Sequence, residues 1–430
     1  PVIRFKVGGK NIVVLNDFES IKEVLTRKEV LYRTENFLLG RFNVNGVATL
    51  NGDAWQENRR FCLHVLRDLG FGRHSLEEHI KEEVRYLKDK LVDLRGSPVN
   101  LRKYLVPSMS NNITALVFGS RYPFDDHRRI FLDETLGKVL KILASGLLFT
   151  FLPRWAFNAA ELLPFTNISK INGIFGDIFQ FVSEQIKLHE DTLEESSNRD
   201  FIDGYIKKMR EHESNPDAFF NMGNLVGNVL NFFGAGSNTV VLTINWHLLN
   251  CADKVDSVQR AIQEEIDSVI GRERQPCWED HKKMPFTVAT IWEMYRWRTV
   301  APLGVPRETA ADIEYKGNFI PKGSSILPNI AAVHMDSKIW YEPDIFNPRR
   351  FLKEDGSGLV SKPDELIPFS VGRRMCPGET LATVEVFLYL TTLLQKFTVL
   401  PMEGETIDFD PALVTLNVPK PQQLRFVCRD

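Results

Sequence analysis

The chain has 430 residues, of which 43% are hydrophobic and 25% are charged, and its formal net charge is −3. This is the composition of a globular protein with enough apolar material for a large core, and the small net charge excludes a general attraction to nucleic acid or acidic membranes. No run of about 18 apolar residues is present, so no transmembrane helix is expected. Neither a disulfide framework nor a zinc knuckle is indicated, because the cysteines are few, odd in number and scattered and form no CxxC pair: Cys62, Cys251, Cys277, Cys376 and Cys428.

The first part of the chain predicts a hairpin followed by helices. Residues 2–15 alternate between apolar and polar positions around a glycine pair, which is typical of two paired strands. Asp17 is a candidate cap for a helix that reaches Leu31, and residues 33–50 are expected to form a loop. Apolar residues at helical spacing predict further helices over residues 75–95, 104–118 and 170–195.

Two stretches in the middle differ from their surroundings. Residues 137–165 are the most apolar part of the chain, but Pro153 interrupts the run after about ten residues, which is too short to span a bilayer. Residues 194–218 are charged and polar and predict a mobile surface stretch rather than a domain linker.

Residues 218–250 predict the longest helix, although Gly234 and Gly236 lie at its centre. A glycine inside a helix costs about 1 kcal/mol relative to alanine, so another interaction must offset both. Either close packing of a neighbouring helix or a groove over a planar ligand would do so. In the second case the hydroxyl of Thr239 could hydrogen-bond a small guest molecule.

The last part of the chain predicts a helix, an ion pair and two small sheets. Glu293 and Arg296 are three residues apart and therefore share one helix face, which by itself is typical of an exposed ion pair. The periodicity predicts a helix over residues 253–271, a small sheet over 312–330 and strands near 397–400 and 422–428.

The stretch Phe369-Ser370-Val371-Gly372-Arg373-Arg374-Met375-Cys376-Pro377-Gly378 precedes an apolar helical run. Backbone N–H groups at a helix start stabilise a thiolate, so this cysteine suits metal binding. Gly372 and Gly378 let the backbone lie close to a flat cofactor, and an arginine offers several donors to a carboxylate. The alternative for a lone cysteine is a small buried hydrophobe in a tight turn.

This stretch resembles the haem-binding signature of the cytochrome P-450 family, Phe-x-x-Gly-x-Arg-x-Cys-x-Gly, at every fixed position. The resemblance covers essentially the whole chain and implies a mainly α-helical haem-thiolate fold with a smaller β region, in a single catalytic domain over residues 1–430. In the family the cysteine of this signature is the iron ligand, so the resemblance implies that Cys376 binds the iron of haem b. Thiolate ligation donates electron density to iron and favours O–O cleavage. The resemblance places four further residues against this cofactor: Phe369, Gly372, Gly378 and Ala235.

The resemblance also assigns polar and charged residues to three roles. The haem propionates would be held by Trp55, Arg59, Arg307 and Arg374. The redox partner would be faced by Arg60, Arg67 and Arg373, for which a solvated basic face is the alternative. A buried network would be formed by Glu293, Arg296 and Arg350. Its role would be structural, since removing one partner of a buried ion pair costs about 3–5 kcal/mol.

The glycine-containing helix departs from the family pattern Ala-Gly-x-Asp/Glu-Thr, whose acid and alcohol relay protons. Thr239 takes the place of the threonine, but Asn238 takes the place of the acid. An amide can position water but cannot titrate, so we expect altered oxygen activation with more hydrogen peroxide released. The substrate pocket would be lined by Phe37, Phe42, Val44, Phe232, Gly236, Val300, Leu303, Val305 and Leu416, and ordinary loop packing is the alternative for the first three.

The function implied by the resemblance is monooxygenation of an apolar xenobiotic, steroid or fatty acid, as in the microsomal branch of the family. Because the chain has no flavin or nicotinamide motif, electrons would come from NADPH through NADPH–cytochrome P-450 reductase, with cytochrome b5 as a further candidate donor. The expected location is the cytosolic face of the endoplasmic reticulum membrane. The family's N-terminal anchor is not in this sequence, so a truncated chain is expected. Two alternatives stay open: a reductase-independent haem-thiolate isomerase or peroxygenase, and a non-catalytic haem-binding sensor.

Overall fold

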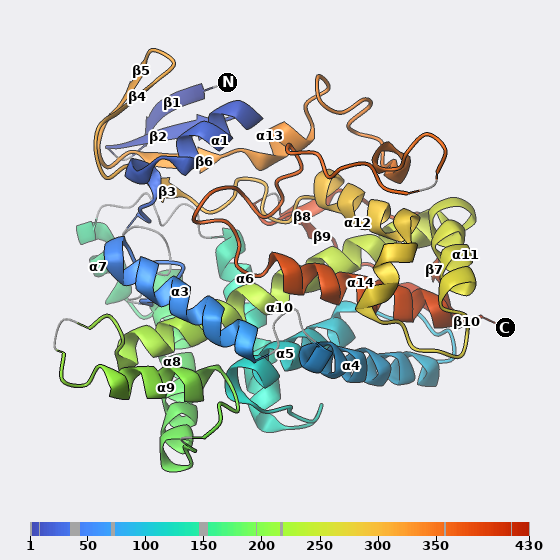
Figure 1. The fold of residues 1–430 in the computed structure, drawn as a ribbon, viewed down its shortest axis with the longest axis horizontal. Coiled ribbons are helices and arrows are strands. Elements are labelled where there is room, and N and C mark those ends of the chain that lie inside the picture. Colours follow the sequence, from blue (N-terminus) through green and yellow to red (C-terminus); the bar gives the residue numbers. More distant parts are fainter. Residues whose placement is uncertain are drawn as a thin grey trace.

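The structure is mainly α-helical, with its largest sheet gathered at one end (Figure 1), as the sequence predicts. This computed structural model describes residues 2–7, 9–34, 44–69, 74–145, 154–194, 196–215, 218–356, 358–413 and 415–429. Phe37 and Phe42, both predicted in the substrate pocket, lie outside the described residues.

The helices confirm most of the predicted ranges. In chain order they are α1 (Phe18–Thr26), α3 (Gly52–Asp68), α4 (His74–Asp93), α5 (Arg102–Phe118), α6 (His127–Ser145), α7 (Arg154–Glu161), α8 (Asn167–Asp191), α9 (Phe201–Glu211), α10 (Met222–Asp253), α11 (Arg260–Val269), α12 (Pro285–Trp297), α13 (Ile330–His334) and α14 (Glu379–Lys396). Short turns of other helix types are η1 (Lys28–Val30), η3 (Val255–Gln259), η4 (Trp278–Lys283) and η5 (Pro348–Phe351).

The predicted N-terminal hairpin is confirmed, since β1 (Val2–Val7) pairs antiparallel with β2 (Lys10–Leu15). The sheet continues in the order β1-β2-β6-β3, with β6 (Ser325–Pro328) parallel to β2 and β3 (Arg307–Glu308) antiparallel to β6. The remaining pairs are β7 (Phe397–Pro401) with β10 (Leu424–Cys428), β4 (Ile313–Tyr315) with β5 (Asn318–Ile320), and β8 (Pro411–Leu413) with β9 (Val418–Pro419).

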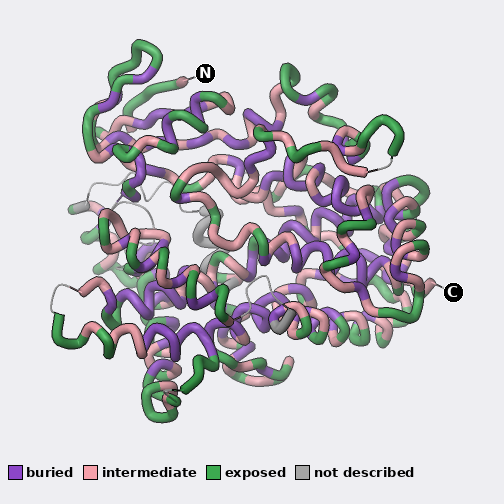
Figure 2. The backbone as a smooth tube through the Cα atoms, in the orientation of Figure 1, coloured by how far each residue is buried: buried purple, intermediate pink, exposed green. Residues whose placement is uncertain are grey.

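α10 runs through the middle of the molecule, where it packs against α5, α14 and β7. At 32 residues it is the longest helix described, as predicted. It is long and apolar enough to cross a membrane, but 67% of its most apolar window is buried inside the fold. Figure 2 shows the same burial along the tube, so α10 acts as a core helix that carries the site described below.

The prediction of a mobile surface stretch over residues 194–218 is wrong for Phe201–Glu211, which form a helix. The first turn of this helix, α9, is capped by Asp200, because the Asp200 carboxylate accepts a hydrogen bond from the Asp203 N–H at 2.9 Å. The charged positions hide an apolar face with helical spacing, and the residues of that face are buried: Phe201, Ile202, Tyr205 and Ile206.

α14 carries a carboxyl group inside the core. Glu385 Oε1 accepts a hydrogen bond from Asn112 Nδ2 of α5 at 2.9 Å, and burial raises the pKa of Glu385 to about 8. Glu385 Oε2 and Asn112 Oδ1 are both buried, and neither has a hydrogen-bond partner among the described residues. A proton on Oε2 suits this environment, so Glu385 is mostly protonated at neutral pH.

A carboxyl group whose pKa is raised by folding destabilises the folded state as the pH rises. We therefore expect the folded protein to lose stability from pH 4.5, the ordinary pKa of glutamate, up to about 8, by at most about 4–5 kcal/mol. Replacing Glu385→Gln should remove this loss. In urea unfolding, the free energy of unfolding of the variant should therefore exceed that of the native protein at pH 8 but not at pH 5. The exposed Glu403→Gln is the matched control, and equal pH profiles for Glu385→Gln and the native protein would contradict the assignment.

Candidate active site

The loop before α14 presents Cys376 at the start of that helix. Gly372 has a φ of +77°, and a Cβ there would lie 3.1 Å from Leu25 O, so the loop requires glycine at this position. The Cys376 N–H donates to Phe369 O at 2.9 Å, and the Gly378 N–H donates to Cys376 Sγ at 3.3 Å. The backbone therefore closes around the sulfur and points a donor at it.

Binding of a metal ion would change the protonation state of the Cys376 side chain. Burial raises the pKa of the Cys376 thiol, while the Gly378 N–H and the nearby Arg59 guanidinium lower it. A metal cation displaces the thiol proton, so metal binding would favour the thiolate. Cys376 is nevertheless among the exposed residues, so the protein does not seal this cysteine from a ligand.

α10 has an accessible face beside its two central glycines. Ala235 and Thr239 are exposed although their neighbours are largely buried, and Thr239 Oγ1 donates to Ala235 O at 2.8 Å. A Cβ on Gly234 would meet no atom within 4 Å, whereas a Cβ on Gly236 would lie 2.5 Å from Ile113 Cδ1 of α5. The two explanations for these glycines therefore apply to different positions. Close packing against α5 accounts for Gly236, whereas the open helix face, which could receive a planar ligand, accounts for Gly234.

Four guanidinium groups gather near the cysteine loop: Arg33, Arg59, Arg307 and Arg374. Burial and then the charges of Arg307 and Arg59 lower the pKa of Arg374 to about 8, and burial followed by the Arg59 charge lowers that of Arg307 to about 10. The pKa of Arg33 is lowered by burial and by the other three. No carboxylate of the described residues offsets these charges, so the cluster favours an anionic ligand.

Several hydrogen-bond donors in this cluster and beside it have no partner within the described ranges. The atoms without a partner among the described residues are Nε and Nη1 of Arg307, Nε of Arg33 and Nε1 of Trp55, all of them buried. Arg374 instead lies 3.8 Å over the Trp55 ring and donates to backbone oxygens of Leu31, Val47 and Leu50 at 2.9, 3.2 and 2.6 Å. Arg374 thus ties the cysteine loop to the segment before α3, while Arg307, Arg33 and Trp55 keep free donors for a carboxylate.

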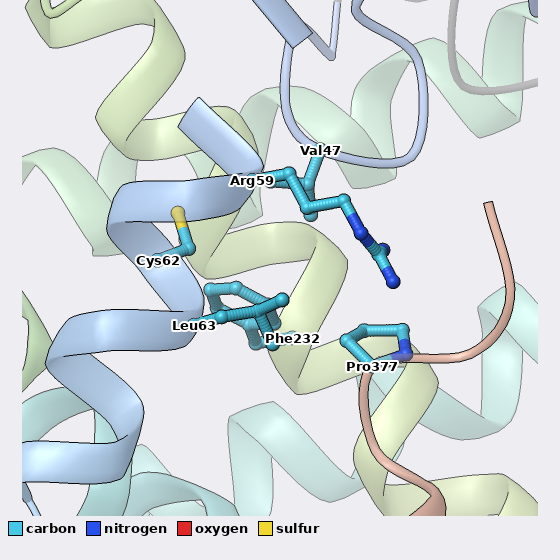
Figure 3. A pocket seen from close by; sticks show the side chains of 6 residues that line it. All are labelled: Val47, Arg59, Cys62, Leu63, Phe232 and Pro377. Atoms are coloured by element: carbon cyan, nitrogen blue, oxygen red, sulfur yellow. The ribbon is translucent and has the colours of Figure 1, made fainter. Parts of the chain in front are cut away.

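A small pocket lies between α3, α10 and the cysteine loop (Figure 3). It is lined by Val47, Arg59, Cys62, Leu63, Phe232 and Pro377. The Arg59 side chain extends from α3 towards Pro377, and its Nη2 donates to Met375 O at 2.7 Å. Phe232, predicted in the substrate pocket, lines this space and also packs edge-on against Phe201 with ring centroids 5.1 Å apart.

The predicted Glu293, Arg296 and Arg350 meet inside the protein. Arg296 Nε and Nη2 donate to the two Glu293 oxygens at 2.8 and 2.7 Å, and Arg350 Nε lies 3.1 Å from both. The Glu293 and Arg296 side chains have no exposed surface. Arg296 Nη1 also donates to the backbone oxygens of His334 and Pro343, both at 2.8 Å. The network therefore joins α12 to α13 and to the segment before η5.

The other residues predicted to line the substrate pocket come from separate parts of the chain. Val44 is buried, Val305 is 40% exposed, and three are half-buried: Val300, Leu303 and Leu416. Arg33 Nη1 donates to the backbone oxygen of Val305 at 2.7 Å, so the segment with Val300, Leu303 and Val305 adjoins the arginine cluster.

The basic residues predicted to face a partner lie on the surface. Arg60 and Arg67 of α3 and Arg373 of the cysteine loop are all exposed. Arg373 Nη2 donates to Gln56 Oε1 at 2.7 Å, which brings the loop and α3 together. None of the three forms an ion pair within the described ranges, so their charges are available to an acidic partner.

The chain matches known proteins over nearly its whole length. The family profile described as Cytochrome P450 matches residues 1–426. The chain belongs to the cytochrome P450 family. Cytochrome P450 2A9 of Mesocricetus auratus is 37% identical over 417 residues, which cover 96% of this chain and 83% of that protein. Cytochrome P450 2F2 of Mus musculus is 35% identical over 425 residues (97% and 85%), and cytochrome P450 2G1 of Oryctolagus cuniculus is 35% identical over 440 residues (100% and 87%).

Membership of the family confirms the predicted fold, the haem cofactor and the monooxygenase reaction. The residues described above fit haem b. An exposed cysteine whose sulfur accepts the Gly378 N–H suits its iron, and the arginine cluster, with unpaired donors and no carboxylate of its own among the described residues, suits its two propionates. When bound, the haem supplies the activation of O₂, and the chain would hold and orient it through Cys376 and these arginines.

Arg33 is the residue of this cluster that sequence reasoning misses. It belongs to no motif, so neither spacing nor periodicity marks it. Its place follows from tertiary contacts: its Nη1 donates to Val305 O and Pro306 O, both at 2.7 Å. The one available signal is an arginine in a segment that is otherwise expected to be an ordinary loop.

Removing one buried guanidinium should affect the haem-free and haem-bound proteins in opposite ways. We expect Arg307→Met to raise the thermal midpoint of the haem-free protein, because it removes an unpaired buried charge, and to weaken haem binding by about 10-fold or more, because a charged hydrogen bond is lost. Haem transfer to an acceptor protein measures the second effect. Arg349→Met, an exposed arginine, is the control, and unchanged haem retention in Arg307→Met would contradict the cluster's role.

Proposed function

We propose that the enzyme takes electrons from NADPH through a separate NADPH–cytochrome P450 reductase. The observation that carries this proposal is the set of exposed arginines beside the cysteine loop, Arg60, Arg67 and Arg373, which form no ion pairs among the described residues. Unpaired basic groups steer an acidic partner to this face. The 430 residues of this sequence contain no flavin or nicotinamide motif, which agrees with a separate donor protein, and we propose cytochrome b5 as a second donor for the same face.

We assign roles at the site by chemistry. Cys376 binds the iron. The propionates would be held by Trp55, Arg33, Arg59, Arg307 and Arg374, and the cofactor would also be contacted by Phe369, Gly372, Gly378 and Ala235. The Thr239 hydroxyl orients water on the accessible face of α10, and the neighbouring Asn238 amide cannot titrate.

The proposed substrate is an apolar molecule such as a xenobiotic, a steroid or a fatty acid. The residues predicted to contact the substrate are aliphatic, aromatic or glycine, so their side chains provide apolar contact surface rather than hydrogen-bonding groups. These residues are Phe37, Phe42, Val44, Phe232, Val300, Leu303, Val305 and Leu416, together with Gly236, whose missing side chain also leaves room for Ile113 of α5.

The proposed location is the endoplasmic reticulum membrane, with the catalytic chain, a single domain over residues 1–430, on its cytosolic face. Large apolar side chains are exposed where α7 meets α8: Leu162 is 84% exposed, Trp155 76% and Phe165 74%. Apolar groups gathered in this way favour contact with a lipid surface.

The experiment is a reconstitution with reductase and NADPH, using a substrate found by a spectral binding screen of sterols, fatty acids and xenobiotics. We expect NADPH-dependent oxygen insertion that falls in a triple Arg60→Glu, Arg67→Glu, Arg373→Glu variant while substrate binding does not change. Turnover of substrate with peroxide but not with NADPH and reductase would favour the peroxygenase alternative, to which Asn238 lends weight. A substrate-dependent spectral shift without any turnover would favour the sensor.

A further inference from the structure

α5 and α10 are joined by a polar contact at the point where the chain departs from its family. Arg102, the first residue of α5, donates from Nη2 to Oδ1 of Asn238 at 3.0 Å. Asn238 is 7% exposed, and Arg102 is half-buried. Thr239, the next residue along α10, is on the accessible face.

The chemistry of the partner fixes the orientation of the amide. A guanidinium carries donors only, so the atom that faces it must be the amide oxygen of Asn238. The amide nitrogen is then the atom that does not face the Arg102 guanidinium; it has two protons to donate, and it donates to no residue in the described ranges. Position 238 therefore offers donors, where a carboxylate would offer only acceptors.

The contact also sets the charge at this position. Arg102 has no ion pair within the described part of the chain. Burial lowers the pKa of its guanidinium, and no neighbouring charged group contributes to that shift. Arginine still remains protonated at neutral pH. The contact between Arg102 and Asn238 thus carries one positive charge and no titratable proton. An acid at position 238 would instead supply a negative charge and a proton that titrates.

We propose that Arg102 is a positioning residue for this monooxygenase, which holds the Asn238 amide by its oxygen and leaves the two donors of the amide nitrogen free of the guanidinium. Proton delivery beside Thr239 then relies on water held by fixed donors, and it does not depend on the titration of a side chain at position 238. The proposal rests on the monooxygenase function, with the haem against the accessible face of α10.

The consequence is that the two residues are coupled. If Asn238 alone becomes an aspartate, Arg102 lies within ion-pair distance and holds the new carboxylate in its charged form. The acid can take up and release protons near neutral pH only when Arg102 is also removed, because burial then raises the pKa of the carboxyl group. A single replacement should therefore not restore what the family's acid does.

The test compares four variants, Arg102→Leu, Asn238→Asp, the double variant and Lys103→Leu, in the haem-loaded protein with reductase, NADPH and an apolar substrate. The measured quantity is hydrogen peroxide released per NADPH between pH 6 and pH 9. Uncoupled turnover consumes NADPH, one proton and O₂ and yields NADP⁺ and hydrogen peroxide, so this ratio reports proton delivery. Lys103, an exposed neighbour of Arg102 on α5, is the matched control.

We expect a flat pH profile for the native protein, Lys103→Leu and Asn238→Asp, and a profile that changes by about tenfold across this range for the double variant. Arg102→Leu should raise the peroxide ratio severalfold. Thermal midpoints give a readout that is independent of turnover: Asn238→Asp should raise the midpoint, and Arg102→Leu should abolish that rise.

Two results would overturn the proposal. One is a pH-dependent peroxide ratio for Asn238→Asp alone, because Arg102 would then not hold the carboxylate. The other is an Arg102→Leu variant whose thermal midpoint falls while its peroxide ratio and pH profile match those of the native protein, because Arg102 would then be only structural. Failure of the proposed function looks different, since the native protein itself would consume no NADPH with reductase.

Discussion

Replacing Glu293→Gln is expected to destabilise the folded protein by about 3–5 kcal/mol. Glutamine keeps the shape of the side chain but removes its charge, which leaves the fully buried Arg296 and the largely buried Arg350 without a counterion. Both guanidinium groups keep their backbone acceptors, so the loss comes from the charge rather than from a cavity. Urea unfolding, followed by tryptophan fluorescence, measures the change in the free energy of unfolding.

Glu273→Gln is the matched control, because Glu273 is exposed and the change should stay within about 0.5 kcal/mol. A Glu293→Gln variant that unfolds within about 1 kcal/mol of the native protein would show that the network contributes little. In that case the backbone acceptors of the two arginines would be sufficient to hold α12 against α13.

Replacing Cys376→Ser is expected to abolish NADPH-dependent oxygen insertion. A serine hydroxyl fits the same turn and can accept the Gly378 N–H bond, but it cannot donate electron density to iron as a thiolate does. The arginine cluster is unchanged, so part of the haem should still bind. Turnover with reductase and the haem content of the purified protein measure the two effects separately.

The control for this change is Cys428→Ser, since Cys428 is also exposed but lies at the end of β10, away from the cysteine loop. It should leave both haem content and turnover as they are. Substantial turnover by Cys376→Ser would contradict the assignment of the iron ligand.

The parts of the site that were predictable from sequence are those in which local spacing carries the geometry. The turn around Cys376 depends on glycines and a helix start within ten residues, and the contact between Glu293 and Arg296 follows from a separation of three on one helix. Both are present in the structure. The long central helix was also predictable, because its apolar character extends over many turns.

What sequence reasoning could not supply depends on contacts between distant segments. Arg33 and Arg102 belong to no motif, and only the packing of the fold brings them to the cysteine loop and to Asn238. The orientation of Arg374 towards the backbone before α3 is likewise a tertiary result. α9 is not predicted from the sequence because charged and polar residues dominate the composition of residues 194–218. The apolar face of the helix is short, and the structure shows its role by burying it.

The most direct test of the central assignment is the absorption spectrum of the reduced, haem-loaded native protein under carbon monoxide. A thiolate from Cys376 on the iron predicts the strongly red-shifted band that distinguishes sulfur from nitrogen or oxygen ligation. A spectrum with the unshifted band of a neutral ligand, in protein that is folded and fully loaded with haem, would contradict it.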